Sequence, residues 1–561
     1  MFRLITDIPN YRASHYPAKA RITSWEGNGS HTVDNKGFVD LITRYGASFE
    51  RLGVSAGNHV CILMPGGDTE LLAAEFALLN LGCVIIPLHA ALPAQDMQSI
   101  IQEVHPTCCI ARTSEELRVL EQIYPPIKLY ALDSLYTLPL ELIEPFQANV
   151  DPKDIALIMY TSGSTGHAKG VILSHENIVS TVLSVLAVIP IRYGHTVMSY
   201  LPMSHILERI AVYCYLATGA HLHFAGNPRQ GMALLKKIRP QYMTAVPRIL
   251  DRAVHLFYRA GDTRHYLVRS LVHWALNTEV RTQGFFRRIA RRLILLRLRR
   301  SYGGRLLGIL VGGAALSQNT ARIFHAAGIP LREGYGLTEC CGAATFNRFD
   351  PGGNMPGTVG IPVPGVQVKI DERLGEVLIK SAGVTRGYYA KPSETAALFT
   401  EDGWLKTGDK GELVNDRFLK IVGRIKEQFK NAYGEYVSPL KLEQLLEEDP
   451  WVERAMAVGS GKPESGALII PDFELIKEWC RSHHVHWTAP MYMAYNTEVL
   501  QEFESHLSKI NRSLAPHEQV QKFKLLYDPW TVENGMLTPS LKLRREVIET
   551  RLEKAINEMY Q

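Results

Sequence analysis

A short segment rich in glycine, hydroxyl groups and one lysine has the composition of a phosphate-binding loop. Residues 160–170 read Tyr-Thr-Ser-Gly-Ser-Thr-Gly-His-Ala-Lys-Gly, and apolar runs at 155–159 and 171–173 flank them. Glycine lets the backbone turn and approach an anion closely. Free N–H groups and hydroxyls can then donate to phosphate oxygens, and Lys169 adds a positive charge. The sequence therefore predicts a buried strand that leads into an anion-binding loop.

This segment has two other interpretations: a Walker loop, which requires a different spacing, and a plain turn without a ligand. A Walker loop requires Gly, four residues and then Gly-Lys-Ser/Thr, but Lys169 is preceded by Ala168 and followed by Gly170. A plain Ser/Gly turn binds nothing. Further motifs along the chain favour the binding loop over the plain turn.

A second candidate segment, Tyr335-Gly336-Leu337-Thr338-Glu339, follows a predicted strand end. A planar tyrosine can stack on a purine, as aromatic side chains stack on bases. A carboxylate suits magnesium, which takes hard oxygen ligands and keeps several waters. Gly336 permits a close approach of the backbone. The alternative is a tight turn after a strand with no binding role.

Three further positions carry weaker signals when each is taken alone. Asp409 in Thr-Gly-Asp suits ribose hydroxyls, although Gly-Asp is also an ordinary turn. Lys542 lies in Thr-Pro-x-x-Lys-x-x-Arg, although a lysine near a C-terminus is normally a solvated charge. His205 lies in Leu-Pro-Met-Ser-His-Ile-Leu-Glu-Arg, and a lone histidine is more often structural than functional.

Length and composition are those of an ordinary globular protein. The chain has 561 residues, is 46% hydrophobic and 21% charged, and carries a net charge of +5, which does not by itself imply nucleic acid. Its eight cysteines form no C-x-x-C pair, so we expect free thiols in a reducing compartment. The N-terminus lacks the apolar core of a signal peptide. The most apolar window, residues 71–93, predicts a buried helix and strand rather than a membrane span.

The hydrophobic pattern predicts an α/β fold. Apolar runs at 59–64, 83–87 and 108–111 alternate with helical patterns at 69–80 and 97–104. Strands that alternate with helices form a mainly parallel sheet with helices on its faces. Residues 345–400, rich in Gly, Pro and short β-type runs, predict a small β subdomain, and the chain from residue 426 predicts a small α+β domain.

Residues 281–305 hold nine arginines, and no acid occurs between Glu279 and Glu333. A helix here places on one face Phe286, Ile289, Ala290, Leu293 and Leu296. It places on the other face Arg287, Arg288, Arg291, Arg292 and Arg299. One interpretation is a solvated cationic face over a helix packed on the core. The other is a membrane-surface helix over 285–300, because each basic residue near an anionic leaflet contributes about 1 kcal/mol.

Taken together, these segments resemble the adenylate-forming enzymes, which include acyl-CoA synthetases, peptide-synthetase adenylation domains and luciferases. The usual phosphate loop of that family is Thr-Ser-Gly-Thr-Thr-Gly-x-Pro-Lys-Gly, and this chain departs from it at Ser164 and at Ala168, where proline is usual. Ala168 should loosen the loop without removing a phosphate contact. Four motifs occur in the family's order: the phosphate loop, Tyr-Gly-x-Thr-Glu, Thr-Gly-Asp with Arg424, and the segment around Lys542. The resemblance therefore covers nearly the whole chain.

The resemblance implies a role for each matching residue. The implied catalytic residues are Lys542, Thr338, Glu339 and His205, the last near the acyl carboxylate. The implied nucleotide-binding and cofactor-binding residues are Thr161, Ser162, Gly163, Ser164, Thr165, Gly166, Lys169, Gly313, Ala314, Tyr335, Gly336, Asp409, Arg424, Lys426 and Lys430. The implied magnesium ligands are Thr165 and Glu339.

Several of these implied roles are specific. Tyr335 flanks adenine, Thr338 contacts the α-phosphate, and Glu339 holds magnesium. Asp409 and Arg424 contact the ribose. Lys426 matches the hinge of the family, so the resemblance implies a large N-terminal domain at 1–425 and a small mobile C-terminal domain at 426–561.

The implied chemistry has two steps and three cosubstrates or cofactors: ATP, Mg²⁺ and coenzyme A. A carboxylate first attacks the α-phosphorus of ATP to give acyl-AMP, and the thiol of coenzyme A then releases AMP and forms acyl-CoA. The segments around His205, Phe429 to Tyr436 and Lys542 resemble the long-chain fatty acid enzymes. Two alternatives stay open: an acyl carrier protein or another acceptor in place of coenzyme A, or a non-catalytic acyl- or nucleotide-binding protein. We expect a cytoplasmic protein without nucleic-acid partners, and the interpretation of 285–300 as a peripheral membrane contact at the inner face stays open beside the solvated face.

Overall fold

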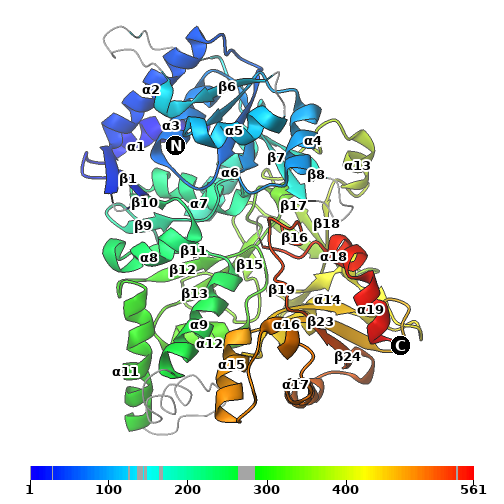
Figure 1. The fold of residues 1–561 in the computed structure, drawn as a ribbon. Helices are drawn as coiled ribbons and strands as arrows, with labels where there is room; N and C mark the ends of the chain where they lie inside the picture. The colour runs from blue at the N-terminus through cyan, green and yellow to red at the C-terminus, as the bar shows by residue number, and fades with distance from the viewer. Residues whose placement is uncertain are drawn as a thin grey trace. The chain divides into compact units, whose positions relative to one another are not determined.

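The computed structural model describes residues 2–27, 29–123, 127–135, 143, 148–162, 168–262, 285–538 and 541–561, and of residues 119, 162, 258–262 and 285–292 it describes the backbone alone. The chain divides into two compact units (Figure 1). The first unit comprises Met1–Lys369, Leu378–Thr407 and Val414–Leu419. The second comprises Ile370–Val377, Gly408–Leu413 and Lys420–Gln561. The predicted domain boundary at 425/426 stays a prediction.

Within the described residues, the first unit contains a six-stranded sheet in the order β6-β5-β3-β4-β7-β8. Its strands are β3 (His59–Met64), β4 (Val84–His89), β5 (Cys108–Ala111), β6 (Lys128–Ala131), β7 (Ile155–Ser162) and β8 (Ala168–Ser174). All neighbours pair in parallel except β7 with β8. Helices α3 (Thr69–Asn80) and α4 (Ala94–Val104) connect β3 to β4 and β4 to β5. The predicted alternation of strands and helices is confirmed.

A nine-stranded sheet in the order β15-β14-β13-β12-β11-β9-β10-β1-β2 also lies in this unit, counted over the described residues. Its strands are β1 (Arg21–Glu26), β2 (Gly29–Asp34), β9 (Thr196–Ser199), β10 (His221–Ala225), β11 (Tyr242–Ala245), β12 (Gly308–Val311), β13 (Leu331–Tyr335), β14 (Thr345–Phe346) and β15 (Ile361–Pro362). In this order, the neighbours from β13 to β1 pair in parallel. The other pairs are antiparallel: β2 with β1, β14 with β13, and β15 with β14. The segments that follow β12 and β13 therefore leave the same edge of the sheet.

Helices complete the first unit. They are α1 (Asp7–His15), α2 (Asn35–Arg51), α5 (Ser114–Ile123), α6 (His175–Leu186), α7 (Ile206–Ala217), α8 (Pro228–Ile238), α9 (Pro247–Asp262), α11 (Phe285–Ser301), α12 (Gln318–Ala326) and α13 (Pro392–Ala397), with 3₁₀ turns η1 (Leu132–Ser134) and η3 (Thr338–Cys340). In the part of the chain that the structure describes, no helix combines the length and the apolar character that a membrane crossing requires.

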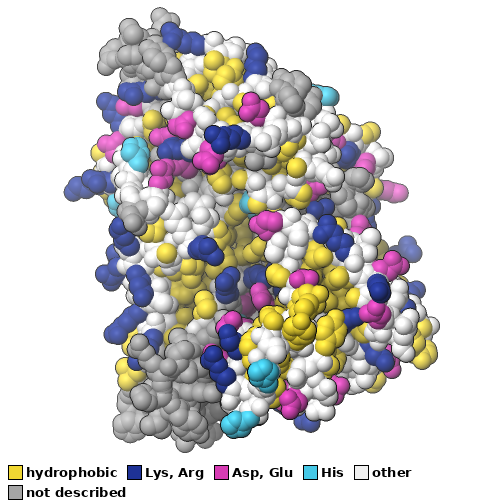
Figure 2. Space-filling model, in the orientation of Figure 1, with side chains coloured by type: hydrophobic (Ala, Val, Ile, Leu, Met, Phe, Trp, Pro, Cys, Tyr) yellow, Lys and Arg dark blue, Asp and Glu magenta, His cyan; other side chains and the backbone are white. Residues whose placement is uncertain are grey.

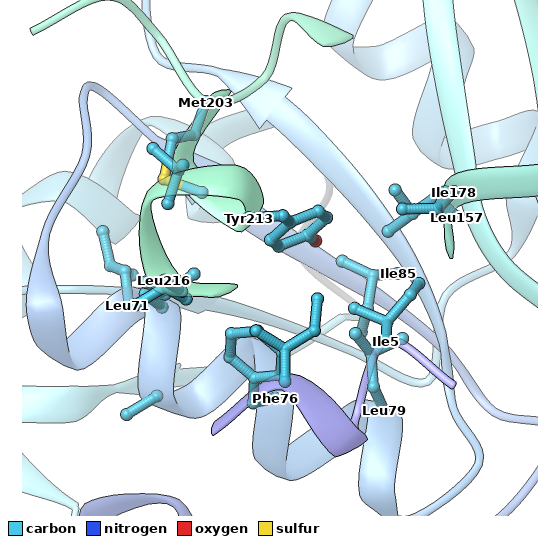
Figure 3. Packing of buried hydrophobic residues seen from close by; sticks show 14 of the residues in the cluster. Ile5, Leu71, Phe76, Leu79, Ile85, Leu157, Ile178, Met203, Tyr213 and Leu216 are labelled. Carbon is cyan, nitrogen blue, oxygen red and sulfur yellow. The ribbon is translucent and has the colours of Figure 1, made fainter. Parts of the chain in front are cut away.

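The main core packs α3 against α7 (Figure 3). The rings of Phe76 and Tyr213 lie 5.8 Å apart, centroid to centroid. Between the same helices, the guanidinium of Arg209 pairs with the carboxylate of Glu75, and neither side chain is exposed. The Tyr213 hydroxyl also donates to Glu75. Because a buried ion pair is costly to break, this contact fixes α7 firmly to α3.

The Arg-rich segment forms helix α11, as predicted, but its core-facing stripe is predicted wrongly where side chains are described. Leu293 is 61% exposed, whereas Leu295 and Leu298 are fully buried. These two pack with residues of α8 in a second buried cluster, so the helix is rotated from the expected orientation. Arg299 is predicted on the free cationic face, yet it donates to backbone carbonyls of the loop that follows the helix.

Four strands of residues 367–424 contribute to both units. They are β16 (Gln367–Ile370), β17 (Glu376–Lys380), β18 (Leu405–Val414) and β19 (Phe418–Arg424), which form a four-stranded sheet in chain order. The strands expected at 366–370 and 375–379 are confirmed as β16 and β17.

The remainder of the second unit is the predicted small α+β region. Its strands are β20 (Phe429–Lys430), β21 (Tyr436–Val437), β22 (Val452–Val458), β23 (Ser465–Pro471) and β24 (Val520–Leu525). Its helices are α14 (Pro439–Glu447), α15 (Phe473–Ser482), α16 (Pro490–Met493), α17 (Thr497–Asn511), α18 (Arg545–Arg551) and α19 (Glu553–Met559), with 3₁₀ turns η4 (Ile425–Glu427) and η5 (Pro516–Glu518). It has its own buried cluster, which includes Leu442 and Phe503. Figure 2 shows hydrophobic side chains at the surface near α16, where Met491 and Tyr492 are exposed.

Candidate active site

The base of the predicted phosphate loop is a β-hairpin. Strands β7 and β8 pair so that Thr161 lies opposite Lys169 and Ser162 lies opposite Ala168. The apolar runs on both strands are buried, which anchors the hairpin in the six-stranded sheet. The loop residues Gly163, Ser164, Thr165 and Gly166 lie outside the described residues, and so does the side chain of Ser162. The structure therefore shows how the loop is mounted, and its phosphate contacts stay a prediction.

The described end of the hairpin lies beside a residue that the sequence analysis misses. The ammonium of Lys169 lies 5.2 Å from the ring centroid of Tyr388. The hydroxyl of the same tyrosine donates to Oε1 of Glu339 at 2.8 Å. Burial and the neighbouring Glu339 carboxylate raise the pKa of Tyr388, so this phenol stays protonated and acts as the donor. One side chain thus links the lysine of the first motif to the carboxylate of the second.

Backbone pairing holds Tyr388 in this place. The residues around it run along β8: the N–H of Ile172 donates to the carbonyl of Gly387, and the N–H of Tyr389 donates to the carbonyl of Gly170. The backbone of Glu339 is tied to the same segment, because its carbonyl accepts from the N–H of Thr385 at 2.8 Å. Lys169, Tyr388 and Glu339 are therefore placed by hydrogen-bonded backbone and not by side chains alone.

Gly313 follows β12, and Tyr335 is the last residue of the neighbouring parallel strand β13. Gly313 has a φ of +87°, which favours glycine, and both Gly313 and Ala314 are exposed. Residues at the carboxyl ends of adjacent parallel strands form the usual ligand-binding edge of an α/β sheet. The structure thus brings these two predicted nucleotide-binding segments together at one edge.

Gly336 is needed for a close approach within the chain itself. A β-carbon added there would lie 2.5 Å from the carbonyl oxygen of Gly342. Between these glycines, residues 338–340 form the short turn η3 with Thr338 and Glu339 half-buried. The glycine therefore folds the motif tightly and so presents the hydroxyl and the carboxylate from one turn.

His205 lies directly before α7, in extended backbone with a φ of −99°. Its ring centroid lies 6.2 Å from that of His89, which ends β4. His89 accepts a hydrogen bond from the N–H of Ala91 through Nδ1, and burial lowers its pKa to about 4, so it is neutral near pH 7. His89 is a second residue of this region that the sequence analysis misses.

In the second unit, the two predicted ribose ligands lie side by side. Nε of Arg424, at the end of β19, is 3.1 Å from Oδ1 of Asp409 in β18. The Asp409 side chain is only 6% exposed, whereas that of Arg424 is 42% exposed. Gly408 precedes the aspartate with a φ of +71°, and its N–H donates to Glu376 at 2.8 Å. The ion pair gives the aspartate a fixed orientation beside an accessible guanidinium.

The predicted catalytic lysine is exposed on a tight turn of the second unit. The N–H of Thr538 donates to the carbonyl of Lys542 at 2.9 Å, and the N–H of Lys542 donates back to the Thr538 hydroxyl at 3.1 Å. Arg454 donates to the carbonyl of Leu541, which has a positive φ. Lys426 and Lys430 are also exposed, and Lys430 lies over the ring of Tyr436.

No cluster of three or more His, Cys, Asp or Glu side chains arranged to hold a metal ion occurs among the described residues. A magnesium ion at Glu339 would therefore be held by one carboxylate together with phosphate oxygens and water. That donor set fits magnesium, which commonly binds through one or two carboxylates and the phosphates of a substrate. The second predicted ligand, Thr165, lies outside the described residues.

Two family descriptions match the chain. The AMP-binding enzyme family matches residues 11–389, and the C-terminal domain of AMP-binding enzymes matches residues 427–561. The long-chain-fatty-acid–CoA ligase FadD15 of Mycobacterium bovis is 28% identical over 540 residues, which cover 91% of this chain and 89% of that protein. The long-chain-fatty-acid–CoA ligase 6 of Mus musculus is 32% identical over 435 residues, which cover 73% of this chain and 61% of that protein.

A solved structure shares the fold. The A domain of a carboxylic acid reductase from Segniliparus rugosus, in complex with AMP and a co-purified carboxylic acid, gives a TM-score of 0.78 at 20% identity, covering 99% of this chain and 94% of that chain. The chain therefore has the adenylate-forming fold, with a large N-terminal α/β domain and a smaller C-terminal domain. Because the family match alone spans residues 11–389, we conclude that the chain belongs to the AMP-binding enzyme family.

Proposed function

We propose that this protein is an AMP-forming ligase that activates a long-chain fatty acid with ATP and transfers the acyl group to coenzyme A. In the first step a carboxylate oxygen forms a bond to the α-phosphorus, and the bond from that phosphorus to pyrophosphate breaks. In the second step the thiol sulfur attacks the acyl carbonyl, the bond to AMP breaks, and the thiol proton passes to solvent. The named long-chain relatives support the choice of substrate.

One observation carries the proposal: Lys169, Tyr388 and Glu339 form a continuous contact chain in the first unit. It sets a cation and a carboxylate on either side of one tyrosine. A carboxylate is a poor nucleophile, so adenylation depends on positioning and on neutralising the phosphate charge. Lys169 serves as the cation for the phosphates, and Glu339 serves as the anchor for a phosphate-bound magnesium. Magnesium, when bound, supplies further neutralisation of the phosphate charge.

The other predicted residues take the remaining parts of the nucleotide. Gly313, Ala314 and Tyr335 form the adenine side at the shared edge of β12 and β13. The Thr338 hydroxyl, on the same turn as Glu339, serves as a donor to the α-phosphate. The Asp409–Arg424 pair takes the ribose hydroxyls: the aspartate accepts from them, and the arginine holds the aspartate in place.

Two residues complete the acyl chemistry. Lys542 donates to the substrate oxygens in the first step, and its exposed position on a short turn suits a group that reaches into a site. His205 lies near the acyl carboxylate, with neutral His89 beside it. Lys426 and Lys430 serve the hinge and the nucleotide in the second unit.

The test is ATP-dependent pyrophosphate release with fatty acids from medium to very long chains, with and without coenzyme A. We expect release to peak at long chains, with acyl-CoA and AMP as products. Acyl-AMP that forms but is not consumed by coenzyme A would replace this acceptor with a carrier protein. No release with any acid, together with retained AMP binding, would make the chain a binding protein and would reject the proposal.

The predicted membrane contact through 285–300 stays a prediction. The side chains of 285–292 lie outside the described residues, and Arg299 binds backbone carbonyls.

A further inference from the structure

A buried acid lies in the first turn of α7, three residues after His205. Glu208 has no solvent exposure. The Thr244 hydroxyl on β11 donates to its Oε2, while its Oε1 makes no hydrogen bond of normal geometry in the described residues. No lysine, arginine or histidine of the described residues neutralises it through a salt bridge. The contact with Thr244 thus connects the start of α7 to the nine-stranded sheet.

The first turn of α7 touches both predicted nucleotide segments. A β-carbon added at Gly342, just after η3, would lie 3.1 Å from Cγ1 of Ile206. A β-carbon added at Gly312, just before Gly313, would lie 3.2 Å from Cδ1 of Leu207. The side chains of Ile206 and Leu207 therefore pack closely against the backbone of Gly342 and Gly312. A small shift of this turn reaches the two segments directly.

We propose that Glu208 is a positioning residue of the active site: its contact with Thr244 fixes the first turn of α7, and with it His205, Ile206 and Leu207 against the acyl and nucleotide segments. The adjacent Arg209 ties the same turn to α3 through Glu75. The contact of Glu208 with Thr244 supplies the restraint on the side of the sheet. For its catalytic readout the inference rests on the proposed function.

The charge state of Glu208 makes the restraint sensitive to pH. Burial raises its pKa to about 7. Hydrogen bonds lower the pKa and so offset part of this rise; they come from the hydroxyls of Ser199 and Thr244 and the backbone of Tyr200 and Leu201. The titratable groups that face it are Tyr200, at the end of β9, and Tyr215, further along α7. Both phenols are protonated near neutrality because burial raises their pKa, so Glu208 alone gains or loses a proton there. The described residues place no cation in a salt bridge with the ionised form, and we expect this buried charge to loosen the turn.

Hydrogen exchange of the full chain, measured by mass spectrometry on peptides within residues 203–212, tests the positioning without any activity. After correction for intrinsic rates, we expect the wild-type peptide to exchange about tenfold faster at pH 8 than at pH 6, the change that one unit of differential proton binding produces. Glu208→Gln should remove this difference, because the amide keeps the shape and does not titrate. Thr244→Val should speed exchange at both pH values.

Thr218→Val is the matched control. Thr218 is a buried threonine at the far end of α7, and its hydroxyl donates to the carbonyl of Tyr215 at 3.1 Å. This variant should leave the 203–212 peptide unchanged. Equal exchange in the wild type, Glu208→Gln and Thr244→Val at both pH values would overturn the inference.

The catalytic readout separates the inference from the proposed function. We expect the KM for the fatty acid in the wild type to change at least about threefold between pH 6 and pH 8, and Glu208→Gln to abolish this change. A merely structural role would lower the active fraction without altering the KM profile. Identical KM profiles in an active wild type and an active Glu208→Gln would overturn the inference. If no fatty acid supports pyrophosphate release, the proposed function fails, and hydrogen exchange still decides the role of Glu208.

Discussion

The candidate site residues of the two units are held in different ways. In the first unit, Lys169, Tyr388 and Glu339 come from distant parts of the chain and contact one another. In the second unit, Lys542 is held by the hydrogen bonds of its own turn with Thr538. The first arrangement fixes distances between side chains, and the second presents one side chain to solvent.

This difference separates two kinds of substitution. A change within the linked set of the first unit removes a contact that another predicted site residue uses, so function and local structure change together. A change of an exposed lysine on a turn removes chemistry and leaves packing intact.

The largest expected effect is at Lys542. Lys542→Ala should slow acyl-AMP formation by about 10²–10³-fold, since that is the usual cost of one positioned donor. Thioester formation from supplied acyl-AMP should change by less than about threefold, and the unfolding temperature should not change, because the side chain is exposed. Lys554→Ala, at a lysine that is 91% exposed in the same unit, is the control. Equal losses in both half-reactions would contradict the assigned role.

The pH dependence of stability sharpens the description of the first unit. The pKa of Glu208 rises from its ordinary value near 4.5 to about 7. The folded state therefore binds this proton more tightly than the unfolded state, and stability is lost as pH rises from about 4.5 through 7. Glutamine does not titrate. The free energy of unfolding of Glu208→Gln, relative to that of the wild type, should therefore rise between pH 5 and pH 8 by up to about 3 kcal/mol. Denaturant unfolding at the two pH values measures this gain, and a difference that does not depend on pH would contradict it.

Asp409 tests whether the second unit also contains a linked pair. Asp409→Asn removes the charge that holds Arg424, and we expect the KM for ATP to rise by about tenfold and stability to fall by about 1 kcal/mol, a modest cost because Arg424 is partly exposed. Glu412→Gln is the control. Glu412 and its partner Lys420 also join β18 to β19, and both side chains are about half exposed. Similar effects of the two substitutions on the KM for ATP would contradict the proposed role of Asp409 at the ribose.

The local patterns of the sequence predict the fold well where one segment determines its own structure. The predicted strand 59–64 and helix 69–80 match β3 and α3 in their limits. The strand is a continuous apolar run, and Asp68 caps the helix by accepting from the N–H groups of Glu70 and Leu71. The fully buried strands and helices of an α/β fold carry strong signals of this kind.

Contacts between distant segments are what the sequence cannot predict. Tyr388 is a single tyrosine outside every motif, and the backbone pairing beside β8 alone brings it to Glu339 and Lys169. The orientation of α11 fails for a related reason: its arginines and leucines are imperfectly separated, so packing on α8 decides that Leu295 is buried and Leu293 is exposed. Neither result has a local signal in the sequence.

The smallest expected effect is the sharpest test of the linked set. Tyr388→Phe keeps the ring beside Lys169 and removes only the hydroxyl that donates to Glu339. A hydrogen bond to a charged group contributes about 1.5 kcal/mol or somewhat more, and a water molecule can replace part of it at this half-buried position. We therefore expect kcat/KM for ATP to fall about fivefold.

The neighbouring Tyr389→Phe is the control for this last substitution, because Tyr389 packs edge-on against His59 and is not in contact with Glu339 among the described contacts. If Tyr388→Phe also raises the magnesium concentration that gives half-maximal rate, while Tyr389→Phe does not, then the hydroxyl orients Glu339 toward the metal. If the two variants match the wild type in both measurements, then Tyr388 is only a packing residue. In that case the sites of the two units would differ less than their contacts indicate, because the carboxylate of Glu339, like Lys542, would be held by its own turn.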